Sequence, residues 1–110
     1  MKIFIAFVLC AIIFLGNRGQ AEELKTFRLE IKDGVLNPIE IKVPAGQRFK
    51  IEIFNIGTSP IEFESIELRK EKVLGPGASS FVVIHALKPG QYKFFDEFHM
   101  DIGQGLIIAE

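Results

Sequence analysis

Several features that support function in other proteins are scarce in this 110-residue chain. Cysteine occurs once, at Cys10, so no disulfide framework can form within the chain. No glycine-rich loop leads into a helix, which leaves phosphate binding without support. Neither a Ser-His-Asp order nor a Cys-His order indicates a nucleophile, so no catalytic residue is assigned. The net charge is only −1, which argues against nucleic acid as a partner because that role needs a basic surface.

The N-terminus holds the longest apolar run. Met1 and Lys2 give a positive start, residues 3–16 are apolar, and Gly19 and Ala21 occupy the small-residue positions of a cleavage site. This pattern is typical of a secretory signal peptide, and the run is short for a transmembrane helix, although an uncleaved anchor is the alternative. We therefore expect residues 1–21 to be a signal peptide and residues 22–110 to be one exported domain.

The expected domain carries a small negative charge and no cysteine. Without Lys2 and Arg18, 11 basic and 14 acidic residues remain, which gives a net charge of −3. A chain of this size without disulfides must depend on a tight apolar core, and eight of the 11 phenylalanines of the full chain lie in this domain.

Short segments with alternating apolar and polar residues fill this domain. The alternation is the period of half-buried strands, turn residues separate the segments, and no long helical pattern occurs. We predict an all-β, Greek-key sandwich of about seven strands, in which the continuously apolar residues 80–87 form a central strand. The seven segments are residues 25–32, 39–43, 48–53, 61–65, 80–87, 92–95 and 105–109. The predicted core is Phe27, Leu29, Ile31, Ile41, Phe49, Ile51, Ile53, Val83, Tyr92 and Phe94.

A carboxylate, an imidazole and a thioether lie within five residues, at Asp96, His99 and Met100. Strand parity puts Asp96 on the inward face, where an unpaired carboxylate is costly to desolvate. A metal, another cation or a hydrogen-bond network must then compensate it. Asp96 as a turn or cap residue and Met100 as a core residue are the alternatives.

A second polar cluster contains Glu62 and Glu64, with no basic residue between them. The two share one strand parity, so the solvent face of an edge strand is the alternative to a metal site. We predict that Glu62, Asp96 and His99 converge on one divalent metal ion, with Met100 and Glu64 as further candidate ligands.

The turn pattern resembles that of cupredoxin domains. The resemblance rests on Pro44-Ala45-Gly46, Asn55-x-Gly57 and Leu87-Lys88-Pro89-Gly90-x-Tyr92-x-Phe94. Within that family, Glu62-Phe63-Glu64-Ser65, Leu68-Arg69-x-Glu71-Lys72 and Phe94-Phe95-Asp96-x-Phe98-His99 are similar to the EfeO-type or Ftr-type cupredoxin-like proteins. The resemblance covers nearly all of residues 25–110 and implies a cupredoxin-like fold and a periplasmic role in iron uptake beside a ferrous-iron permease.

The chain departs from the copper-transfer cupredoxins at their ligand positions. Glu62 stands where they have a histidine and Asp96 where they have a cysteine, while His99 matches their second histidine. Their axial methionine comes later, where this chain offers Gln104 as a weak ligand. Without a thiolate no blue copper centre can form. Two carboxylates and one imidazole suit Fe(II), Fe(III), Cu(II), Mn(II) or Zn(II) better than Cu(I), and copper or iron is the expected ion.

Two functions follow from the sequence and the resemblance. The first is a metal-binding protein that takes Cu(II) or iron for a ferrous-iron uptake system, by delivery to an inner-membrane iron permease or by ferroxidase-type oxidation. The second is a metal-free interaction module that docks on a membrane transporter. Whether the protein is an enzyme, and its oligomeric state, stay open at this point.

Overall fold

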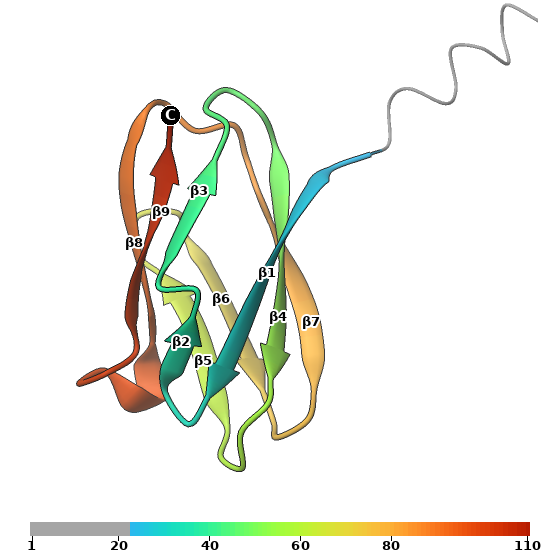
Figure 1. The fold of residues 1–110 in the computed structure, drawn as a ribbon, viewed down its shortest axis with the longest axis vertical. Helices are drawn as coiled ribbons and strands as arrows, with labels where there is room; N and C mark the ends of the chain where they lie inside the picture. Colours follow the sequence, from blue (N-terminus) through green and yellow to red (C-terminus); the bar gives the residue numbers. More distant parts are fainter. Residues whose placement is uncertain (1–22) are drawn as a thin grey trace, which may run out of the picture.

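The computed structural model describes residues 23–110, which form two packed β-sheets (Figure 1). One sheet has four strands in the order β2-β1-β4-β7, and the other has five in the order β3-β9-β8-β5-β6. Within the described range there is no α-helix, and none of its segments is a helix long and apolar enough to cross a bilayer. The predicted signal peptide, residues 1–21, lies outside the described residues.

The elements are short, as the turn spacing predicts. They are β1 (Lys25–Lys32), β2 (Val35–Asn37), β3 (Glu40–Val43), β4 (Phe49–Asn55), β5 (Ile61–Ser65), β6 (Lys70–Leu74), β7 (Ser79–Ile84), β8 (Gly90–Asp96), the 3₁₀ turn η1 (Glu97–His99) and β9 (Gln104–Ala109). Two neighbouring pairs run parallel, β1 with β4 and β3 with β9, and the other pairs are antiparallel.

The core fills the space between the inner faces of the two sheets. Along β4 every second side chain is buried, beginning with Phe49, as the alternation predicts. Phe63 on β5 stacks on Phe94 of β8 with ring centroids 5.4 Å apart, and both rings are almost fully buried. Each large ring buries roughly 150–250 Å² of surface, so aromatic packing supplies a large part of the apolar core on which a domain without cysteine depends. The predicted all-β sandwich is confirmed.

The structure corrects the strand count and two details. Nine strands form, because Val35–Asn37 and Lys70–Leu74 also pair within the sheets. The strand β7 lies at the edge of its sheet, so its predicted central position is wrong. Val82 and Ile84 are the buried members of β7 and Val83 is only half-buried, because a continuous apolar run does not fix which parity faces inward.

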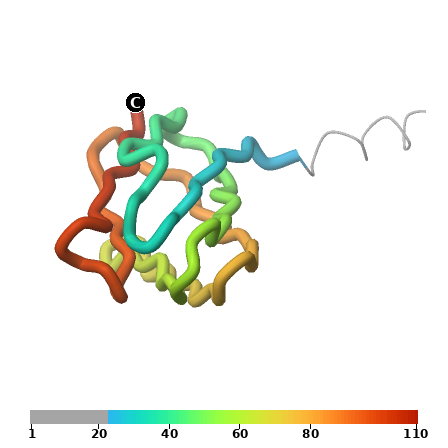
Figure 2. The backbone as a smooth tube through the Cα atoms, turned by 60° about the horizontal axis from the view of Figure 1, so that its bottom comes forward, coloured from blue at the N-terminus to red at the C-terminus, as the bar shows by residue number. Residues whose placement is uncertain are grey.

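One end of the sandwich gathers η1, the β1–β2 turn and the β4–β5 loop (Figure 2). The buried amide of Asn55 fixes the β4–β5 loop: its Nδ2 donates to the carbonyls of Ser59 and Leu74, and its Oδ1 accepts from the Gly57 amide. The Asn-x-Gly motif therefore sets the path of the chain into β5. We call this end the rim.

Candidate metal centre

Asp96 ends β8 and points into the domain, as strand parity predicts. Its side chain is completely buried. Oδ1 accepts hydrogen bonds from the backbone amides of Glu62, at 3.0 Å, and Phe98, at 3.1 Å. The second of these bonds caps η1 at its N-terminus. The carboxylate thus joins β8 to β5 and starts the turn that follows it.

His99 ends η1 and completes the hydrogen bonding of Asp96. Its Nδ1 lies 2.7 Å from Oδ2 of Asp96, and its Nε2 lies 3.3 Å from Oγ of Ser59 on the β4–β5 loop. The ring packs on Gly34, where a Cβ atom would come within 2.5 Å of Cβ of His99. Gly34 also has φ +90°, which favours glycine, so the β1–β2 turn and the imidazole fit together closely.

Asp33 extends this network to the β1–β2 turn. Its Oδ1 accepts from the amides of Thr58 and Ser59 and, at 2.8 Å, from the Ser59 hydroxyl. The hydroxyl bond, followed by the two amide bonds, lowers the pKa of Asp33 because all three stabilise the carboxylate. We call Asp33, Ser59, Asp96 and His99 the rim network. It leaves none of its buried side-chain nitrogen or oxygen atoms without a partner and joins three segments that are distant in sequence.

Glu62, Glu64 and Glu97 form a second, separate cluster, which we call the acidic group. Glu62 and Glu64 alternate with the buried Ile61, Phe63 and Ser65 along β5, so both point to the outer face of the five-stranded sheet. Glu97 approaches them from η1. Each of the three offers a carboxylate oxygen within 4.8 Å of the others. Among residues 23–110, ion pairs within 4.0 Å join only Arg28 to Glu30 and His99 to Asp96, so no cation neutralises the acidic group there.

Crowding of these carboxylates changes their titration. A hydrogen bond with Glu97 is the largest cause that raises the pKa of Glu64, to about 7, and partial burial and the neighbouring negative charges add to it. Partial burial, followed by the charges of Glu97 and Glu71, raises the pKa of Glu62. Glu71 stands directly opposite Glu64 in the β5–β6 ladder. Like charges at such a position repel, which adds a smaller contribution to the rise in the pKa of Glu64.

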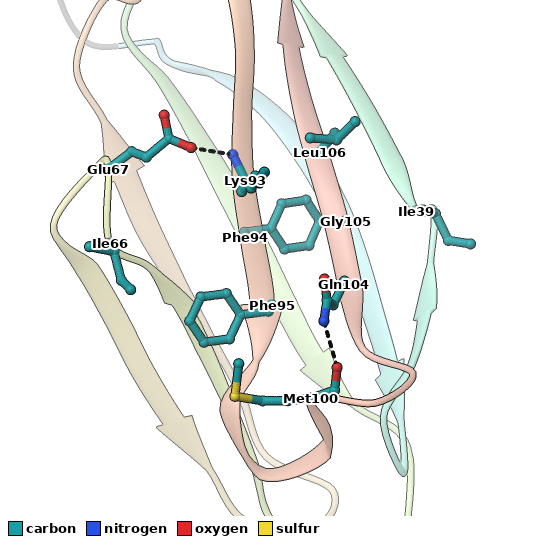
Figure 3. A pocket seen from close by; sticks show the side chains of 10 residues that line it. All are labelled: Ile39, Ile66, Glu67, Lys93, Phe94, Phe95, Met100, Gln104, Gly105 and Leu106. Atoms are coloured by element: carbon teal, nitrogen blue, oxygen red, sulfur yellow. Dashed lines mark hydrogen bonds between the residues drawn. The ribbon is translucent and has the colours of Figure 1, made fainter.

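Met100 belongs neither to the rim network nor to the acidic group. Its side chain is 47% exposed and lines a hollow on the outer face of the five-stranded sheet beside Phe95 (Figure 3). Gln104, which the sequence offered as a weak ligand, donates from Nε2 to the Met100 carbonyl instead.

The structure divides the predicted ligand set into separate places. Asp96 and His99 meet in the rim network, whereas Glu62 and Glu64 meet in the acidic group. Glu62 contacts Asp96 through its backbone amide and not through its carboxylate. A metal-ligand role for each of these residues and for Met100 stays a prediction. The sequence pattern alone did not single out Glu97. It has the outward parity of β8, so pairing β8 with β5 would have revealed it.

The cupredoxin resemblance implies copper, and the rim network can be tested for its fit. Both oxygens of Asp96 and both ring nitrogens of His99 already face hydrogen-bond partners. Among the described residues no buried side-chain nitrogen or oxygen lacks a partner, and no thiolate is present. The rim network therefore does not fit a buried copper ion in this geometry. The acidic group does fit a divalent ion, because its carboxylates are close together and without a cation.

Comparisons with known proteins agree with the architecture. A family model described as "Cupredoxin-like domain" matches residues 4–109. An uncharacterized protein of Rickettsia prowazekii (strain Madrid E) is 37% identical over 82 residues, which cover 74% of this chain and 66% of that protein. The chain thus spans 66% of the length of that relative.

Solved structures with low sequence identity share the fold. The metal-binding domain of the Cu(I)-exporting P-type ATPase CopA of Streptococcus pneumoniae D39 has a TM-score of 0.68 at 17% identity, covering 84% of this chain and 99% of that chain. A purple cupredoxin from Nitrosopumilus maritimus has a TM-score of 0.58 at 17% identity, covering 76% and 99%. The two packed sheets and the family match together show that the chain belongs to the cupredoxin-like domain family.

Proposed function

We propose that the protein binds one divalent metal ion, Cu(II) or Fe(II), at the acidic group. The observation that carries this proposal is the approach of three carboxylates to within 4.8 Å without a cationic partner among residues 23–110. A bound cation would replace the proton on Glu64 and offset the repulsion among Glu62, Glu64 and Glu97. The raised pKa of Glu64 supports this reasoning, because the same close approach of carboxylates produces it, first through the hydrogen bond with Glu97 and then through burial and the neighbouring negative charges.

The donor chemistry narrows the choice of metal. Carboxylate oxygens suit Cu(II), Fe, Mn(II) or Zn(II) and are poor ligands for Cu(I). Cu(II) generally binds most tightly among the divalent first-row ions, and an acidic site stabilises Fe(III) relative to Fe(II). Metal binding and delivery is the simplest role for such a site. A ferroxidase-type role, with Fe(II) as the substrate to be oxidised, is its enzymatic alternative.

The proposed setting is the periplasm, where the protein would serve a ferrous-iron uptake system and an inner-membrane iron permease. The apolar run at residues 3–16, followed by small residues, supports export. The resemblance of the Glu62-Phe63-Glu64 and Asp96-x-x-His99 segments to EfeO-type proteins supports the link to iron.

A metal-free module that docks on a membrane transporter is the second candidate. The rim network favours it, because Asp96 and His99 are held by hydrogen bonds and need no ion to compensate the buried carboxylate.

Calorimetric titration with Cu(II), and anaerobically with Fe(II), distinguishes the two candidates. Wild type should bind one ion, and Glu64→Gln should weaken binding at least tenfold. His99→Ala, refolded and checked by circular dichroism, should bind within about threefold of wild type, and Met100→Leu is the matched control. Affinity should fall as the pH drops through about 7, because protons compete for Glu64.

Two results would overturn this assignment. Loss of binding in His99→Ala with retention in Glu64→Gln would restore the ligand set Glu62, Asp96 and His99. Failure of wild type to bind either metal would leave the docking module as the function.

A further inference from the structure

An apolar hollow lies on the outer face of the five-stranded sheet, beside the acidic group (Figure 3). We call it the groove. Its volume is about 470 Å³, within the range of roughly 300–1,000 Å³ typical of ligand pockets. Its apolar walls come from strands β8 and β9 and from the loops beside β3, β5 and η1. They are Ile39, Ile66, Phe94, Phe95, Met100 and Leu106. The polar part of the lining comes from Glu67, Lys93 and Gln104.

Three of these apolar side chains are exposed to solvent, and Phe95 and Leu106 are half-buried. Ile66 is 73% exposed, and Ile39 and Met100 are also open to solvent. In Figure 3 Phe95 lies between Ile66 and Met100, with Leu106 further along the sheet. Exposed apolar side chains gathered around one hollow and rimmed by charged residues are typical of grooves that bind a ligand or a partner.

The acidic group borders the groove directly. Phe95 and Glu64 are opposite each other in the β5–β8 ladder and have the same outward parity. Side chains at such positions are neighbours, with Cβ atoms about 4.5–5.5 Å apart. Glu97 follows Phe95 by two residues and therefore has the same outward parity, so it adds a carboxylate to this border. Apolar contact beside these charges excludes water and strengthens their attraction for a cation.

We infer that the groove is a docking site for a protein segment that carries an apolar side chain flanked by lysine or arginine. The apolar side chain would fill the space over Phe95, and the flanking cations would face Glu64 and Glu97. Lys93 and Glu67 line the groove with opposite charges, so the acidic border sets the charge that the occupant needs. Two copies of this chain meeting face to face would bring two acidic groups together, and an anionic lipid surface would be repelled by them.

This inference does not depend on the metal site, and its test is made in EDTA so that the two proposals fail separately. Three synthetic peptides serve as probes: Lys-Arg-Leu-Phe-Lys-Arg, its charge-reversed form Glu-Glu-Leu-Phe-Glu-Glu, and the apolar-free Lys-Arg-Ser-Ser-Lys-Arg. Each is titrated into the ¹⁵N-labelled protein, expressed from the full chain, and followed by two-dimensional NMR. The first peptide should shift the amides of Phe95, Met100 and Leu106 and bind at least tenfold more tightly than the other two.

Variants separate the apolar and the charged contributions. Phe95→Ser should weaken the first peptide at least tenfold, as expected for a central aromatic anchor. Met100→Gln makes the same test at an exposed position outside the core, where folding is not at risk. It should weaken the binding of the first peptide severalfold. Glu64→Gln should reduce both the affinity and its dependence on salt. Phe81→Ser, an exposed aromatic position on the other sheet, is the control and should leave binding unchanged.

Three outcomes would overturn the inference. The first is that the amide resonances of the groove residues do not shift. The second is equal binding of the two basic peptides, which would make the attraction purely electrostatic. The third is self-association of the protein through the groove in sedimentation experiments.

Discussion

Replacing Asp96 with alanine removes a carboxylate that holds two sheet strands and a turn together. The side chain is fully buried and accepts from the Glu62 amide, the Phe98 amide and Nδ1 of His99, the last at 2.7 Å. Loss of the cap on η1 costs about 0.5–2 kcal/mol. A buried donor left without a partner costs about 1–3 kcal/mol, and the Glu62 amide would become one. We therefore expect Asp96→Ala to lower the free energy of unfolding by about 1.5–5 kcal/mol, the sum of these two contributions, compared with the 5–15 kcal/mol typical of a domain.

Asp96→Asn tests the charge of the Asp96 side chain while keeping its size and shape. Asparagine keeps an oxygen that can accept from both backbone amides, and it replaces the charged acceptor that faces Nδ1 of His99 with an uncharged NH₂ donor. Its cost should therefore be about 1–2 kcal/mol. Urea unfolding of wild type, both variants and the exposed control Asp101→Ala measures these differences, and an unchanged m-value would show that stability alone changed. A cost below about 1 kcal/mol for Asp96→Ala, or equal costs for alanine and asparagine, would refute the argument.

Three further predictions follow. Phe94→Ala should cost about 3–5 kcal/mol in urea unfolding, because the ring is buried against Phe63; a cost near zero would contradict that packing. The raised pKa of Glu64 predicts a stability contribution that is complete below pH 4.5 and lost as the pH rises towards about 7. Glu64→Gln should remove this loss in unfolding curves taken across that window, and an unaltered pH profile would show that the proton is not shared. Mass spectrometry of the exported protein should find a chain that begins after Ala21, whereas retention of residues 1–21 would exclude cleavage there.

The strands were largely predictable from the sequence, because a period of two is visible wherever one face is buried. In β4 the alternation of Phe49, Ile51 and Ile53 with polar residues determines both the strand and its inward face. The edge strand β6 was missed because its pattern Lys70-Glu71-Lys72 buries only the final Leu74. The edge position of β7 depends on which strands pair, and strand pairing leaves no trace in local periodicity.

The candidate site was only partly predictable for a related reason. Parity correctly placed Asp96 inside and Glu62 and Glu64 on one face. It could not show that Ser59, which itself donates to Asp33 of another loop, would lie against Nε2 of His99 and so occupy the rim with hydrogen bonds. Contacts between segments far apart in the sequence decide which polar groups are compensated and which remain available for a ligand.

The location of a bound metal tests the central claim most directly. Crystals of the protein soaked in Cu(II) at pH 8, where Glu64 is ionised, can be measured at the copper absorption edge. The account predicts one anomalous difference peak bonded to carboxylate oxygens of Glu62, Glu64 and Glu97, with the hydrogen bond between Asp96 and His99 intact. A peak on His99 or Asp96, or the absence of any peak at the acidic group, would contradict it.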